Sequence, residues 1–145
     1  MLDYMKSWIS KHGAYMAWAI ALASMFGSLY FSEIAGLAPC ILCWYQRIAM
    51  YPLVIIIGIG ILQRDQRVSR YVLPFSIIGA AIALYHNFLV WGVVSEKLAP
   101  CVAGVSCVTQ KFVALNFITI PLLSLTAFVL ITALMFVYRA DTHHG

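Results

Sequence analysis

Residues 112–138 read FVALNFITIPLLSLTAFVLITALMFVY and contain no Asp, Glu, Lys or Arg. An α-helix rises about 1.5 Å per residue, so about 20 apolar residues cross a hydrocarbon core roughly 30 Å thick. This stretch is longer than that minimum. It therefore predicts a transmembrane helix, which we place at about residues 115–138.

Three other parts of the chain also lack charged residues: 13–32, 48–63 and 71–95. The second is long enough to cross a bilayer only if its helix begins near Ile41 and includes Arg47. We therefore predict four transmembrane helices, at about residues 14–32, 41–62, 71–91 and 115–138. Pro74 would lie in the first turn of the third helix, and we expect Pro52 and Pro121 to kink the helices that contain them.

The composition agrees with a membrane protein. The 145 residues are 63% hydrophobic and 10% charged, whereas soluble domains carry about 25% charged residues. A soluble helical bundle of this composition could not cover its surface with polar groups. The four helices and their short connections account for most of residues 1–145, which predicts one integral membrane domain, an all-α, up-down four-helix bundle.

Lysine and arginine fall mainly on one side of this predicted bundle. Six of them precede the first helix, occupy the loop QRDQRVSR or follow the last helix, and only Lys97 and Lys111 belong to the opposite side. Positive residues favour the cytoplasmic side of a membrane. We therefore expect both termini to be cytoplasmic, and the connections before the second and fourth helices to be extracytoplasmic.

All four cysteines, Cys40, Cys43, Cys101 and Cys107, lie in those two outward connections or at their edges. Thiols outside the cytoplasm meet oxidising conditions, and four cysteines allow three pairings. We favour the two local pairs, although a zinc site or purely structural disulfides remain alternatives. A disulfide between Cys40 and Cys43 would close a very short loop and contribute little stability. Thiols at a helix start are instead well placed for redox chemistry.

Two ionisable residues accompany the Cys40–Cys43 pair. Arg47 follows Cys43 by four residues, so the two share a helix face. It could stabilise a thiolate or a negatively charged acceptor, or it could extend to the membrane surface. His86 lies near the outer end of the third helix, where a packed core histidine and a functional one are equally reasonable. Gln46 and Asn87 are weaker polar candidates.

Two outward cysteine pairs can pass electrons by thiol–disulfide exchange. Such a relay needs an electron sink, and the chain has no glycine-rich dinucleotide motif, haem motif or iron–sulfur spacing. A membrane quinone fits, because it dissolves in the bilayer and its reduction creates negative charge that Arg47 could stabilise.

The sequence PCILCWYQR, with a second cysteine pair and four spans, resembles the DsbB/BdbC family of thiol oxidoreductases. PCVAGVSC and FITIPLLSL are similar to the BdbC branch. The resemblance covers essentially the whole chain. It implies a bacterial plasma-membrane protein that reoxidises a DsbA/BdbD-like thioredoxin-fold thiol oxidase and passes the electrons to menaquinone or ubiquinone.

By position, the resemblance also implies residue roles. Cys43 would contact the quinone, with Arg47 as the essential arginine and His86 nearby. Cys101 would form the mixed disulfide with the partner, and Cys107 would be its pair. The cysteines of the second pair are closer in sequence than in longer family members, which puts in doubt transfer by a mobile loop. A quinone-linked reductase of the vitamin K epoxide reductase type and a disulfide-stapled, non-enzymatic subunit are the alternative functions.

Overall fold

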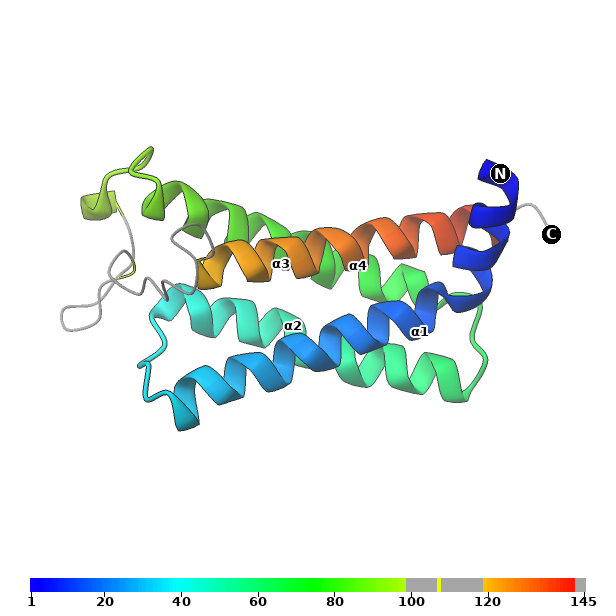
Figure 1. Ribbon diagram of the computed structural model, residues 1–145, viewed down its shortest axis with the longest axis horizontal. Helices are drawn as coiled ribbons and strands as arrows, with labels where there is room; N and C mark the ends of the chain where they lie inside the picture. Colours follow the sequence, from blue (N-terminus) through cyan, green and yellow to red (C-terminus); the bar gives the residue numbers. More distant parts are fainter. Residues whose placement is uncertain (99–106, 108–118, 143–145) are drawn as a thin grey trace.

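The computed structural model describes residues 1–98, 107 and 119–142. All regular secondary structure in these residues is helical (Figure 1). The long helices are α1 (Leu2–Leu29), α2 (Ile41–Leu62), α3 (Val68–Val90) and α4 (Ile120–Thr142). Two short elements are a π-helical turn, η1 (Tyr30–Ile34), and a 3-10 turn, η2 (Glu96–Leu98).

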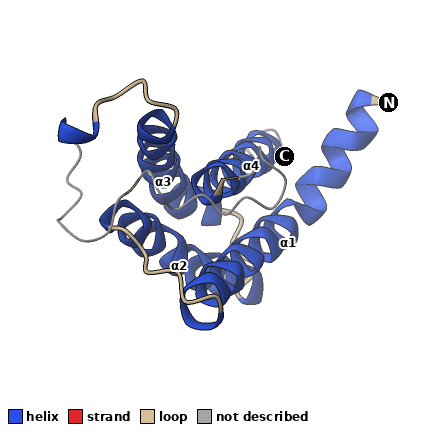
Figure 2. Ribbon diagram, turned by 60° about the vertical axis from the view of Figure 1, so that its left-hand side comes forward, coloured by secondary structure: helices blue, strands red, loops and turns tan. Residues whose placement is uncertain are grey.

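The four long helices form the predicted up-down bundle. Each contains a stretch of 20 to 24 residues that is long and apolar enough to cross a membrane. Helices α1 and α3 each pack against α2 and α4 (Figure 2). The N-terminus and the end of α4 lie at one end of the bundle with the α2–α3 turn, which we call the terminal end (Figure 1). The opposite end, where α2 begins, is called the cysteine end. Which side of a membrane each end faces stays a prediction.

Some helix boundaries differ from those expected. Helix α1 begins at Leu2 rather than near residue 14, and its first turns extend beyond the other helices (Figure 2). Helix α3 begins at Val68, so Pro74 lies inside it rather than in its first turn. Pro52 lies inside α2 as expected.

The start of the last helix also needs correction. Residues 115–118 lie outside the described residues, but Thr119 is not helical and α4 begins at Ile120. Pro121 is therefore the second residue of α4 and not an interior residue. A proline there gives up only an N–H that has no helical partner. The kink expected at Pro121 has no basis.

Small residues allow the helices to approach closely. A methyl group added to Gly60 of α2 would lie 2.8 Å from Cβ of Val68 in α3. Interhelical hydrogen bonds add to this packing: the Trp18 indole N–H donates to the Val54 carbonyl at 3.1 Å, and the Thr132 hydroxyl donates to Ser76 at 3.0 Å. Small residues and interhelical hydrogen bonds are what hold helices together where lipid removes the hydrophobic driving force.

Candidate functional site

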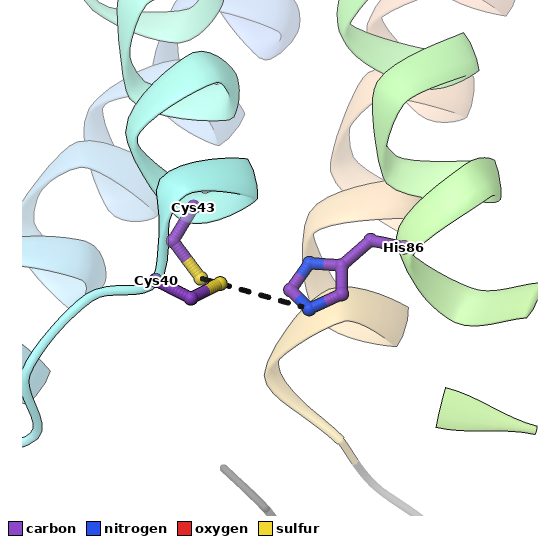
Figure 3. Close-up of side chains that lie close together, drawn as sticks. All are labelled: Cys40, Cys43 and His86. Carbon is purple, nitrogen blue, oxygen red and sulfur yellow. Dashed lines mark hydrogen bonds between the residues drawn. The ribbon is translucent and has the colours of Figure 1, made fainter. Parts of the chain in front are cut away.

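Cys40 and Cys43 lie at the cysteine end of α2. Cys40 is the N-cap residue, with an extended backbone, and its carbonyl accepts the first helical bond from the Trp44 N–H at 3.1 Å. This geometry turns both side chains to the same side of the helix start (Figure 3). Both residues are thiols, and their sulfurs lie 3.2 Å apart. A disulfide bond is about 2.05 Å long, so the structure holds the pair in its reduced form, with the sulfurs already in contact.

His86 of α3 faces this pair (Figure 3). The side chain is 1% exposed, and its Nε2 lies 3.9 Å from the Cys40 sulfur and 3.2 Å from the Cys107 carbonyl oxygen. Its Nδ1 lies 3.1 Å from the Gln46 side-chain nitrogen. A carbonyl can only accept, so Nε2 must carry the proton. In the neutral ring Nδ1 then accepts a hydrogen bond from the Gln46 amide.

Cys107 joins the same cluster. It is buried and disulfide-bonded, and it packs with Cys40, Leu42 and Leu89. The other cysteine of the predicted second pair, Cys101, lies outside the described residues. His86 therefore touches the sulfur of one redox candidate, Cys40, and the backbone of another, Cys107.

The surroundings of Cys40 favour its thiolate. A hydrogen bond from the Cys43 thiol, opposed by burial and assisted by His86, lowers the pKa of Cys40 to about 4. Cys40 also precedes the first residue of the membrane span, at the positive end of the α2 dipole. The lowered pKa favours Cys40 over Cys43 as the thiolate of the reduced pair.

Arg47 is tied to α1. Its Nε donates to the Ser28 hydroxyl at 2.7 Å, and a terminal nitrogen donates to the Ser28 carbonyl at 2.8 Å. The guanidinium also lies 5.5 Å from the centre of the Trp44 ring. These three partners are uncharged, so among the described residues they orient the guanidinium of Arg47 without neutralising its positive charge.

A cavity of about 410 Å³ lies between α1, α2 and α4 next to Cys43 and Arg47. Most of its lining is apolar, and the wall includes Leu123 and Leu130, which are 48% and 46% exposed. Gln46 also lines it. Among the described residues His86 is not part of the wall, so Gln46 is the side chain that touches both His86 and the cavity.

The Cys40 and Cys43 sulfurs and a His86 ring nitrogen all lie within 4.8 Å of one another. These are ligands that soft or borderline metals accept. The four-cysteine zinc site considered from the sequence does not match this arrangement, because Cys107 is in a disulfide.

Several residues that organise the site were only weak candidates, or no candidates, in the sequence analysis. Gln46 and Asn87 are buried, and Asn87 donates to the Ala83 carbonyl at 2.8 Å and to the Pro121 carbonyl of α4 at 3.0 Å. Their polarity within apolar runs was the available signal, since buried polar groups need partners. Ser28 carried no comparable signal, because many serines in membrane helices bond only to their own backbone.

Comparison with known proteins identifies relatives across most of the chain. The family model described as "Disulfide bond formation protein DsbB" matches residues 10–138. The Bacillus subtilis (strain 168) protein "Disulfide bond formation protein C" is 50% identical over 127 residues, which cover 88% of this chain and 92% of that protein. A "Probable disulfide formation protein C" from Halalkalibacterium halodurans is 50% identical over 115 residues, covering 79% and 84%. No solved structure was found to match.

Proposed function

The chain belongs to the DsbB family of disulfide bond formation proteins, and we propose that it transfers electrons from a thioredoxin-fold thiol oxidase to a membrane quinone. Family membership and the four spans make it a multi-pass membrane oxidoreductase that forms disulfides. The proposed partner is a DsbA/BdbD-like oxidase outside the cytoplasm, and the proposed acceptor is menaquinone or ubiquinone. The cysteine end would face that partner, with both termini in the cytoplasm.

The cavity beside Cys43 is the observation that carries the proposal. Its apolar lining suits an isoprenoid quinone, and its partly exposed wall between α1 and α4 gives a lipid-soluble molecule a route from the bilayer. Arg47 supplies a positive charge that Ser28 orients. A quinone bound there would supply a two-electron acceptor whose reduction creates negative charge. A fixed cation lowers the cost of that charge in a medium of low dielectric constant.

The inner pair, Cys40 and Cys43, would perform the final transfer. The Cys40 thiolate is 3.2 Å from the Cys43 sulfur. An S–S bond would form between them as the Cys43 S–H bond breaks and an electron pair leaves through the Cys43 sulfur, which lines the cavity. Counted from two thiols, disulfide formation releases two electrons and two protons, one of which Cys40 has already given up on becoming a thiolate. The electron pair and the Cys43 proton would leave toward the cavity, where a bound quinone would accept them, with the second proton taken from water, and become a hydroquinone.

The outer pair, Cys101 and Cys107, would receive electrons from the partner. The partner's dithiol reduces that disulfide through a mixed disulfide at Cys101. A thiolate of the outer pair then attacks the Cys40–Cys43 disulfide, which becomes a dithiol while the outer disulfide forms again. Each exchange moves two electrons and two protons and needs no other reactant.

His86 has a positioning role in this scheme. Its Nε2–H group bonds to the Cys107 carbonyl and lies against the Cys40 sulfur, so Cys107 is held beside the inner pair. With Cys107 already beside the inner pair, electron transfer would not need a mobile loop. The close spacing of Cys101 and Cys107 in the sequence had made such a loop doubtful. We propose that His86 affects the quinone only through Cys40 and Gln46, because it does not line the described part of the cavity.

Purified protein in lipid nanodiscs, supplied with a reduced thioredoxin-fold oxidase and a quinone, tests the proposal directly. We expect hydroquinone to form in a 1:1 ratio with oxidised partner, as followed by quinone absorbance and by thiol trapping. Continued turnover with quinone and oxygen both removed would contradict the proposal. A structural disulfide or a reductase of the vitamin K epoxide reductase type would not couple partner oxidation to quinone reduction in this way.

The order of transfer is tested by trapping. In Cys107→Ala the mixed disulfide with the partner at Cys101 cannot be resolved by its pair, so a partner-linked species should accumulate. The matched Cys101→Ala variant should give no such species. A partner linked to Cys40 instead would show that the order is wrong.

A further inference from the structure

The reduced inner pair and His86 bring three metal-ligating atoms together, namely two sulfurs and one ring nitrogen. Zinc bonds to thiolate sulfur at about 2.3 Å and to histidine nitrogen at about 2.0–2.1 Å, so a tetrahedral ion separates two sulfurs by about 3.8 Å and a sulfur from a nitrogen by about 3.6 Å. The structure has 3.2 Å between the sulfurs and 3.9 Å between the Cys40 sulfur and His86 Nε2. Changes of about 0.6 Å and about 0.3 Å in these two spacings would match the ion. The third spacing, from the Cys43 sulfur to a His86 ring nitrogen, is within 4.8 Å and would have to close by up to about 1.2 Å.

The surroundings also provide support for the histidine ligand. Metal-bound histidine usually donates its second ring N–H to a neighbouring oxygen, which fixes the ring orientation. If Nε2 bound a metal, the proton would move to Nδ1, which lies 3.1 Å from the Gln46 amide nitrogen. Rotation of that amide by half a turn would present its oxygen to Nδ1–H in place of its nitrogen.

We propose that the reduced enzyme binds one soft or borderline divalent ion, such as Zn²⁺ or Cd²⁺, through Cys40, Cys43 and His86. A fourth position is left for water or an incoming ligand, as in other three-ligand zinc sites. Binding releases the remaining thiol protons and occupies both sulfur lone pairs that disulfide formation needs. Oxidation to the Cys40–Cys43 disulfide removes two ligands, so only the reduced form binds the ion.

The consequence for activity follows from the proposed function and rests on it. An ion held by both sulfurs prevents their oxidation by quinone, so the enzyme is trapped in its reduced form. Metal binding itself involves neither quinone nor partner. The site and the inhibition can therefore be tested separately.

Binding is tested by titrating Cd²⁺ into the purified, reduced full-length protein without quinone, following sulfur-to-cadmium charge-transfer absorbance. We expect one ion per chain and no binding to the oxidised protein. His86→Ala should weaken binding at least tenfold and Gln46→Ala roughly tenfold, because ligands and their supports have such effects. His12→Ala, which changes an exposed histidine of α1, is the matched control and should have no effect.

Co²⁺ absorbance gives a second measurement that does not depend on the folding of variants. A tetrahedral site with two sulfurs and one nitrogen should give intense visible bands together with sulfur-to-cobalt charge transfer. Equal Cd²⁺ affinities for the wild type and a folded His86→Ala variant would overturn the three-ligand site, as would octahedral Co²⁺ spectra.

Inhibition is then measured as loss of quinone reduction in Zn²⁺ and its recovery after a chelator is added. Recovery would support the proposed trapping, because oxidative damage would not be reversed. Binding that depends on His86 but leaves quinone reduction intact would support the metal site and contradict the proposed electron route through Cys40 and Cys43.

Discussion

Near the terminal end of the bundle, Gly60 lies directly against Val68, and the buried side chains around them are apolar apart from the small hydroxyl of Ser69. Near the cysteine end, by contrast, Gln46, His86 and Asn87 are all buried, and a cavity lies beside them. Close packing of small residues stabilises helix association in lipid, whereas buried polar groups are costly there. We infer that the terminal half contributes mainly to the stability of the bundle, and that the cysteine half carries mainly the residues of the reaction.

The largest effect expected in the cysteine half is that of Cys43→Ser. Serine cannot form the disulfide, so quinone reduction should be abolished, while the thermal midpoint stays close to that of the wild type. Quinone absorbance and a thermal melt of the same sample measure both. Full retained activity would refute the assignment of Cys43.

Arg47→Ala should slow quinone reduction roughly a hundredfold, as expected when one donor that stabilises developing charge is removed. Thiol exchange with the partner should change much less. Arg47→Lys is the matched control, because it keeps the charge but cannot make both hydrogen bonds to Ser28. Its rate of quinone reduction should lie between those of the wild type and Arg47→Ala. If the substitution slowed partner exchange more than quinone reduction, the assignment of Arg47 to the quinone step would be wrong.

Gly60→Ala, in the terminal half, should lower stability and leave activity unchanged. The added methyl group would lie 2.8 Å from Val68 Cβ, and overpacking of this kind costs about 1–3 kcal/mol. The free energy of unfolding should fall by that amount, with the activity of the folded fraction preserved. At Gly27 of α1 an added Cβ meets nothing within 4 Å, so Gly27→Ala should be neutral or stabilising by up to about 1 kcal/mol. Equal destabilisation by both substitutions would remove the packing argument.

The smallest expected effect is on the pH dependence of the reduced inner pair. Because the pKa of Cys40 is lowered to about 4, its thiolate should persist from neutral pH down to about pH 5 and be lost as the pH falls through 4. Thiolate absorbance of the reduced Cys101→Ala/Cys107→Ala protein measures this. His86→Ala should move the loss to higher pH, since one stabilising hydrogen bond is gone. Loss near the ordinary thiol pKa of about 8.5 would contradict the assignment.

The sequence by itself determined the four spans, because a bilayer excludes charge. Three of the charge-free runs are long enough to cross it, and the fourth is long enough once its helix includes Arg47, so no knowledge of packing was needed. It also determined the pairing of Cys43 with Arg47 on one helix face, since four residues make about one helical turn. The PCILCWYQR motif indicated the family, which the comparisons confirmed.

Only the tertiary structure decided which neighbours the other helices bring to these residues. Helices that are apolar on most sides have no single inward face that a sequence pattern reveals. The rotation of α3 turns His86 toward Cys40 and Cys107 instead of the cavity, and the position of α1 places Ser28 against Arg47. These contacts depend on how side chains from separate helices fit together, which no single segment of the chain contains.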